Sequence, residues 1–170
     1  MILRMRCVST AIIAFSLLFC ASVSAEESRI DETSPHVAVL PKSAAQELGR
    51  LGSRPGVPKL EATWEPTKAE IEGAESRLSM IPKLVGRVGR GGTGSGVVEN
   101  PARYYRQYLG IVIGARKLMY LNAFLLDKNE IPSDWRSRLV SFCDGGAAFW
   151  GAMYDPETHE FTRLEINGGF

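Results

Sequence analysis

The sequence has few residues that could cross-link a fold or bind a soft metal. Three cysteines and two histidines occur in 170 residues. Because Cys7 and Cys20 lie in the first 25 residues, a chain that loses this segment keeps Cys143 alone and can form no intramolecular disulfide. His36, His159 and Cys143 provide no pair with the spacing of a zinc site. We therefore expect a fold held by its hydrophobic core, without a metal or another cofactor.

The sequence also lacks an excess of charge of one sign. Lys and Arg number 20 and Asp and Glu 19, which gives a formal net charge of +1 at pH 7. A nearly neutral chain has no broad positive field to hold a phosphate backbone, so we expect no nucleic-acid partner. The hydrophobic content of 45% is that of an ordinary globular domain.

Residues 1–25 have the pattern of a secretory signal peptide. Arg4 and Arg6 precede an apolar run at 11–21, and the small residues at 23–25 favour cleavage directly after them. The run is about half of the roughly 20 residues that a membrane-spanning helix needs, so we expect no stable membrane insertion after cleavage. The pattern predicts a periplasmic or secreted protein.

A lipoprotein anchored through Cys20 is the alternative use of this segment. Phe19 stands immediately before that cysteine, where lipid attachment favours a small side chain. We therefore favour simple cleavage after Ala25.

Residues 26–62 predict an extended, mobile leader. Prolines recur in this stretch, and no helical or strand periodicity is sustained. A short helix over 43–51 is compatible with the sequence, with Ser43 at its start and Gly52 after its end, but nothing indicates that it packs. We place a single folded domain at 63–170.

A capping box marks the first clear helix. Thr67 is followed three residues later by Glu70, so each side chain can bond to the other residue's backbone N–H. One helical face then carries the apolar residues Ile71, Ala74, Leu78 and Ile81. Pro82 ends the run, and the pattern predicts an amphipathic helix.

Residues 86–96 are rich in glycine and contain a G-x-G-x-x-G pattern at Gly89, Gly91 and Gly94. That motif binds a dinucleotide only between a strand and the helix of a βαβ unit, and here it follows a helix in an exported chain. We interpret 86–96 as a flexible loop with no cofactor.

From Tyr104 onward the chain has the composition of strands. Residues 104–113 and 116–126 flank Gly114-Ala115, which predicts a hairpin with a type II′ turn and Ile113 opposite Arg116. The alternative is a helix that begins at Asn100-Pro101 and ends at Gly110.

Three further strands are predicted over 138–143, 149–154 and 161–166, with turns at 144–146 and 155–158. One helix followed by about five sequential antiparallel strands predicts an α+β domain. We expect the helix to cover one face of the sheet and the other face to stay open for a partner.

Cys143 and His159 are the residues most suited to nucleophilic chemistry. However, Cys143 ends an apolar stretch and precedes Asp144, whose negative charge would raise the pKa of the thiol. We interpret Cys143 as a buried structural residue, with an intermolecular disulfide and a nucleophile as alternatives. A calcium site is a further alternative, with Asp144, Asp155 and Glu157 as its ligands, although Asp in turns more often bonds to nearby backbone.

Large and amide side chains gather on the predicted strands and near their ends. The candidates for a binding surface are Tyr104, Arg106, Tyr108, Asn122, Trp135, Asp144, Trp150 and Asn167. Tyr, Trp and Arg supply much of the binding energy at protein interfaces. The alternative is that these residues pack the core and edges, with Arg106 paired to Asp144.

The same stretch resembles a group of small exported proteins of Gram-negative bacteria to which no activity is assigned. The shared residues are Tyr105-Arg106-Gln107-Tyr108-x-Gly110, Asn122, Trp135, Cys143-Asp144-Gly145-Gly146 and Asn167-Gly168, within about 64–170. The resemblance implies a periplasmic or secreted product with a helix-plus-sheet domain, and it carries over no catalytic residue.

We therefore expect a non-enzymatic periplasmic binding protein, of inhibitor or immunity type, that presents its sheet or a loop to a protein partner. One alternative is an envelope hydrolase that uses Cys143 or Asp144 with His159. The other is a structural envelope component that dimerises through Cys143.

Overall fold

A computed structural model describes residues 34–51, 54, 59–89 and 95–169. The predicted signal peptide lies outside these ranges. Within them, no helix combines the length and the apolar character needed to cross a membrane.

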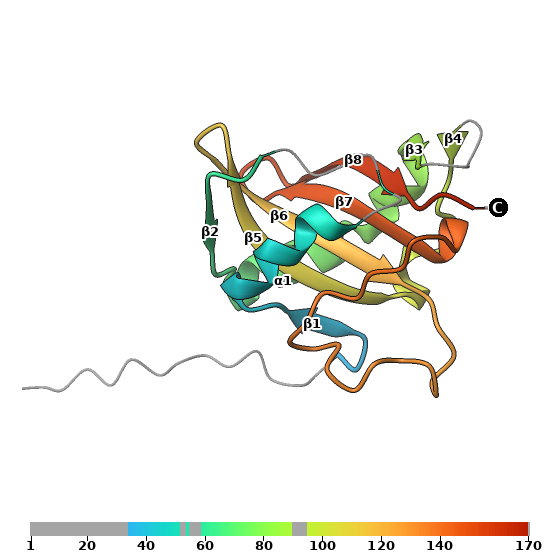
Figure 1. The fold of residues 1–170 in the computed structure, drawn as a ribbon. Helices are drawn as coiled ribbons and strands as arrows, with labels where there is room; N and C mark the ends of the chain where they lie inside the picture. The colour runs from blue at the N-terminus through green and yellow to red at the C-terminus, as the bar shows by residue number, and fades with distance from the viewer. Residues whose placement is uncertain (1–33, 52–53, 55–58, 90–94, 170) are drawn as a thin grey trace, which may run out of the picture.

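An eight-stranded, mostly antiparallel sheet forms the centre of the fold (Figure 1). Its strands are β1 (Val37–Val39), β2 (Ala62–Trp64), β3 (Gly86–Val88), β4 (Ser95–Gly96), β5 (Tyr105–Ile113), β6 (Arg116–Phe124), β7 (Phe149–Asp155) and β8 (Glu160–Ile166). Seven lie in the order β1-β5-β6-β7-β8-β3-β4, and β2 pairs with β5 beyond β1. The mixed helix-and-sheet architecture is as predicted. The expected number of strands is wrong, because β1 to β4 have two or three residues each and are too short to show periodicity.

The central hairpin has the predicted register, with Ile113 opposite Arg116 and Gln107 opposite Asn122. The alternative helix ending at Gly110 is wrong, since only a 3-10 turn, η3 (Pro101–Arg103), precedes β5.

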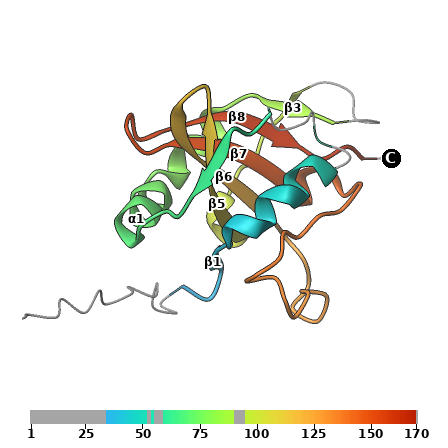
Figure 2. The ribbon, with the colours of Figure 1, turned by 60° about the vertical axis from the view of Figure 1, so that its left-hand side comes forward.

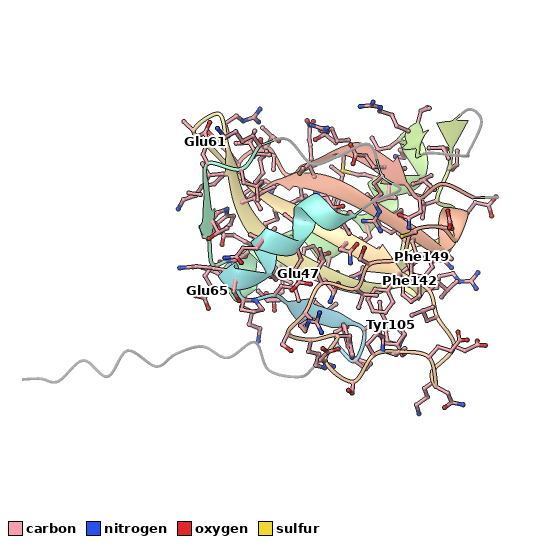
Figure 3. The ribbon with its side chains drawn as sticks, in the orientation of Figure 1. Glu47, Glu61, Glu65, Tyr105, Phe142 and Phe149 are labelled. Atoms are coloured by element: carbon pink, nitrogen blue, oxygen red, sulfur yellow. The ribbon has the colours of Figure 1, made fainter. Side chains whose placement is uncertain are left out.

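The turn of this hairpin differs from the expected type II′. Gly114 and Ala115 both have positive φ, 57° and 62°, as a type I′ turn requires. The carboxylate of Glu61 accepts the backbone N–H of both residues, each at 3.0 Å, and so stabilises a conformation that alanine disfavours (Figure 3).

Helix α1 (Lys68–Ser76) begins with the predicted capping box. Thr67 Oγ1 accepts the N–H of Glu70, and the Glu70 carboxylate accepts the N–H of Thr67 at 2.7 Å. The predicted single helix is divided, because the chain changes after α1 to a 3-10 helix, η2 (Leu78–Lys83). The four apolar residues of the predicted stripe are all buried nonetheless.

Both faces of the sheet are covered, so the expected open face is wrong (Figure 2). Helices α1 and η2 pack on the face that carries Tyr108 and Trp150, which we call the α1 face. On the other, the η1 face, the 3-10 helix η1 (Lys42–Arg50) packs against Leu109 and Ile111.

The prediction of an extended leader is wrong between Val37 and Leu51. Strand β1 pairs in parallel with β5, and Ala44, Leu48 and Leu51 of the η1 segment are buried in the core. The sequence did not indicate this packing because a short helix anchored by three apolar side chains produces no sustained periodicity.

The flexible-loop interpretation of 86–96 is wrong for its two ends. They form β3 and β4, in which a Cβ on Gly86 or Gly96 would lie within 3 Å of Ile166 Cδ1, so these glycines permit close packing. The motif residues Gly91 and Gly94 lie outside the described residues.

Asp155 stabilises the tight turn between β7 and β8. Its carboxylate accepts the N–H of Glu157 at 2.9 Å and that of Thr158, and it pairs with Arg116. Burial raises the pKa of Asp155, but these three partners outweigh burial and hold the pKa below its ordinary value.

The pKa of Asp155 is lower in the folded than in the unfolded protein, so the ionised carboxylate stabilises the fold at pH values above the unfolded pKa, which is near 4. This contribution is lost as the pH falls through the folded pKa. We expect Asp155→Asn to lower the free energy of unfolding by about 1 kcal/mol at pH 7 and by much less at pH 3, measured by urea denaturation. The control is Asp134→Asn, whose pair with Arg138 is exposed. An equal loss at both pH values would contradict this role.

Candidate functional site

A long segment without helix or strand connects β6 to the 3-10 helix η4 (Gly146–Ala148) and thus to β7. We call residues 125–148 the β6–β7 loop. The strand predicted over 138–143 is wrong, because Leu139 and Val140 are buried by packing against the η1 face of the sheet and not by pairing with a strand. Loops of this length are uncommon in compact domains and frequently functional.

Three buried amide side chains of the sheet lie beneath this loop. Gln107 on β5 and Asn122 on β6 are fully buried, and Asn167 follows β8 directly and is 1% exposed. We call them the amide triad. Gln107 and Asn122 lie directly opposite each other, so both side chains project from the same face.

The amide of Gln107 fixes the middle of the loop. Its Nε2 donates to the backbone carbonyls of Trp135 and Arg138, the latter at 2.7 Å. Its Oε1 accepts the N–H of Val140 at 3.0 Å and the Nδ2 of Asn122 at 2.7 Å. A single side chain therefore contacts three backbone positions of the loop.

The two asparagines fix the remainder. Asn122 Nδ2 also donates to the carbonyl of Val140 at 2.9 Å, and Asn167 Nδ2 donates to the carbonyls of Phe142 and Asp144 at 2.8 and 3.2 Å. Every loop atom bonded by the amide triad belongs to the backbone, so the triad holds the course of the loop without bonding any of its side chains.

Arg54 orients the two asparagines from the opposite side. Its Nε donates to Asn167 Oδ1 at 2.6 Å, and its Nη1 donates to Asn122 Oδ1 at 2.7 Å and to the hydroxyl of Tyr120 at 2.8 Å. Burial raises the pKa of Tyr120 although the positive charge of Arg54 opposes it, so the phenol stays neutral. With their oxygens bonded to Arg54, both amides direct their N–H groups to the loop.

The loop presents Phe142 and Cys143 to solvent. Phe142 is 42% exposed although its ring lies 4.5 Å from that of Phe149 (Figure 3). Cys143 is exposed, so the expectation of a buried structural thiol is wrong. The reason is that 138–143 forms no strand and its last residues leave the core.

The structure divides the eight predicted binding residues between the two faces of the sheet. Tyr104, Arg106, Tyr108 and Trp150 belong to the α1 face, and Asn122, Trp135, Asp144 and Asn167 to the η1 face. All except Asp144 are buried. They therefore do not form one exposed surface. On the η1 face, Asn122 and Asn167 bond to the loop, and Trp135 and Asp144 are part of it.

The pairing of Arg106 with Asp144, given above as part of the alternative, is wrong, because Arg106 projects toward α1. There its Nε and Nη2 bond both oxygens of the Glu75 carboxylate at 2.8 and 2.9 Å, and the hydroxyl of Tyr108 donates to the same carboxylate at 2.6 Å. Burial, together with the charge of Glu75, raises the pKa of Tyr108 well above its ordinary value. Asp144 instead contributes its backbone carbonyl to the loop.

Tyr104 and Trp150 pack together on the α1 face, with ring centroids 5.5 Å apart. The hydroxyl of Tyr104 donates to the carbonyl of Ala147 at 2.9 Å and so anchors the end of the β6–β7 loop.

The structure does not bring Cys143 and His159 together. Cys143 lies before β7, whereas His159 lies in the turn after it, bonded through Nδ1 to the hydroxyl of Tyr154 at 3.0 Å. The seven residues of β7 span roughly 20 Å, far beyond the reach of a nucleophile and its base.

The same separation divides Asp144 from Asp155, so the carboxylates of the considered calcium site do not meet. Over the described part of the chain, no group of three or more His, Cys, Asp or Glu residues could hold a metal ion.

Sequence reasoning did not select Gln107, Arg54 or Glu75. The predicted register sets Gln107 opposite Asn122 on a largely apolar face of the hairpin, and this polar pair is a usable signal. No local pattern indicates Arg54, which is 113 residues from Asn167, or connects Glu75 with Arg106.

No protein-family model matches the chain, and no curated protein and no solved structure gives a significant match.

Proposed function

We propose that this chain is an exported, non-enzymatic binding protein that presents its β6–β7 loop to a protein partner. The observation that supports this proposal is the amide triad, which bonds the backbone of the loop from Trp135 to Asp144. A loop that is already ordered loses little conformational entropy when it binds, and binding loops are commonly held on a rigid scaffold.

The side chains that the loop presents suit a protein surface. Phe142 is a large, partly exposed aromatic residue. Arg136 is also exposed, and its guanidinium is held by stacking on the ring of Trp135 at 4.6 Å and by a hydrogen bond to the carbonyl of Val37 at 2.9 Å. Aromatic residues and arginine are enriched where protein interfaces gain most of their energy. The predicted signal peptide supports a partner in the cell envelope or outside the cell, in keeping with an inhibitor or immunity role.

The test is affinity capture of the tagged protein from its own periplasm, with quantification of co-purifying proteins by mass spectrometry. We expect one partner in stoichiometric amount with the wild type and its loss with Phe142→Asp. Val85→Asp is the matched control, since Val85 is also an exposed apolar residue but lies before β3, outside the loop. Equal capture by both variants, or no partner with the wild type, would contradict the proposal.

Exposure of Cys143 favours a second candidate, a structural component that dimerises through this thiol. In an oxidising compartment, two thiols can transfer two electrons to a disulfide oxidant and release two protons as the bond forms. On a non-reducing gel, we expect wild-type protein from the periplasm to run at twice its mass and Cys143→Ser to run as a monomer. A wild-type monomer under these conditions would exclude this candidate.

A further inference from the structure

The guanidinium of Arg54 occupies a site that consists of acceptors from separate parts of the sheet. The acceptors are Tyr120 and Asn122 on β6 and Asn167 after β8, and all three bond to Arg54 at 2.6 to 2.8 Å. Arg54 is 7% exposed, so these bonds are shielded from water. We call Tyr120, Asn122, Gly151, Glu165 and Asn167 the Arg54 site.

Gly151 provides the room for this guanidinium. It lies on β7 between Asn122 on one neighbouring strand and Glu165 on the other. A Cβ at this position would lie 2.3 Å from the hydroxyl of Tyr120 and 2.9 Å from Arg54 Nη1. Because Gly151 has no side chain, the hydroxyl of Tyr120 and the guanidinium of Arg54 can meet above β7.

The charge of the site also suits a cation. Glu165 is 3% exposed and interacts electrostatically with Arg54, Arg87 and Arg163. Burial raises the pKa of Glu165, whereas these cations lower it. A cation in the Arg54 site thus offsets part of the cost of a buried carboxylate.

Next to the site, β8 contains a bulge. The pairing of β7 with β8 shifts between Gly151 and Met153, and Arg163 in the bulge has a φ of 52°. Backbone in the left-handed region is unfavourable for arginine, and bulges often direct side chains beside functional sites. Here the bulge sets Glu165 opposite Gly151 on the η1 face.

From these contacts we infer that the Arg54 site is a specific receptor for a guanidinium group, which Arg54 fills as a tethered ligand and which a free guanidinium cation can fill when that side chain is removed. The specificity follows from geometry. The side-chain oxygens of Asn167 and Asn122 accept from two different nitrogens of the planar guanidinium, Nε and Nη1. An ammonium ion has a single donor nitrogen and cannot reproduce this arrangement.

The experiment replaces the tethered ligand with a free one. Thermal unfolding of Arg54→Ala is followed in 0–20 mM methylguanidinium, and the parallel titration uses methylammonium. A ligand that binds only the folded state at ten times its dissociation constant raises the ratio of folded to unfolded protein about elevenfold. We expect a saturable rise in Tm for Arg54→Ala with methylguanidinium alone.

Two controls isolate the site. Wild type keeps it filled, and Arg138→Ala removes an arginine whose side chain is 68% exposed, so neither should gain stability. If Arg54→Ala is unfolded without ligand, circular dichroism should show refolding on addition of methylguanidinium. No stabilisation or refolding of Arg54→Ala, an equal effect on either control, or an equal effect of methylammonium would overturn the inference.

Discussion

Replacing Asn122 with alanine is expected to lower the free energy of unfolding by about 3 kcal/mol. The substitution removes bonds to Arg54, Gln107 and the carbonyl of Val140, and it leaves these buried groups without their partner. A buried polar group that loses its partner costs about 1–3 kcal/mol, and the separate losses do not add fully because the groups form one network. Urea denaturation monitored by circular dichroism measures the effect.

Asn100→Ala is the matched control for this prediction. Asn100 is exposed and its side chain forms no cap bond to η3, so its replacement should change stability by less than about 0.5 kcal/mol. A similarly small effect of Asn122→Ala would show that the amide triad contributes little to the fold.

Replacing Glu75 with alanine is the second substitution with a large expected effect, again about 3 kcal/mol. Arg106 has a side chain only 5% exposed, and it would lose both bonds to the Glu75 carboxylate while Tyr108 lost its acceptor. Removing one partner of a buried ion pair costs about 3–5 kcal/mol, and the lower end applies because the Glu75 side chain is 25% exposed.

The control comes from the same helix. Glu72 forms an exposed pair with Lys68 at 4.0 Å, so Glu72→Ala should cost less than about 0.5 kcal/mol in the same denaturation experiment. Equal effects of the two substitutions would show that the carboxylate of Glu75 is not an anchor between α1 and the sheet.

The elements that the sequence predicts well are those with a local cause. The capping box at Thr67 and the hairpin around Gly114 depend on residues a few positions apart, and the structure confirms both. The type of turn was not predictable, because the positive φ of Ala115 depends on Glu61, which is distant in the sequence.

The covering of the η1 face was not predictable for a related reason. Strand β1 and η1 are short, and they are stabilised by packing on β5 and β6 more than by their own propensity. Residues 138–143 are the opposite case, a segment with the pattern of a strand that forms none. Their apolar side chains suggest a strand, but the amide triad bonds the backbone N–H and carbonyl of Val140, which a neighbouring strand would otherwise pair.

The candidate site was predicted in part. Asn122 and Asn167 were selected from sequence, but as parts of an exposed surface, whereas they act from inside the fold. Their role depends on Arg54 and on loop carbonyls, contacts that span 18 to 113 residues and that only the tertiary structure brings together.

Amide hydrogen exchange at Val140 tests most directly whether the amide triad holds the β6–β7 loop in place. The N–H of Val140 donates to Gln107 Oε1 at 3.0 Å, so it should exchange as slowly as amides of the central strands in the wild type. In Gln107→Met, we expect fast exchange at Val140 while the amides of β6 and β7 stay protected. Fast exchange at Val140 in the wild type would contradict a preformed loop, and with it the argument for a binding function.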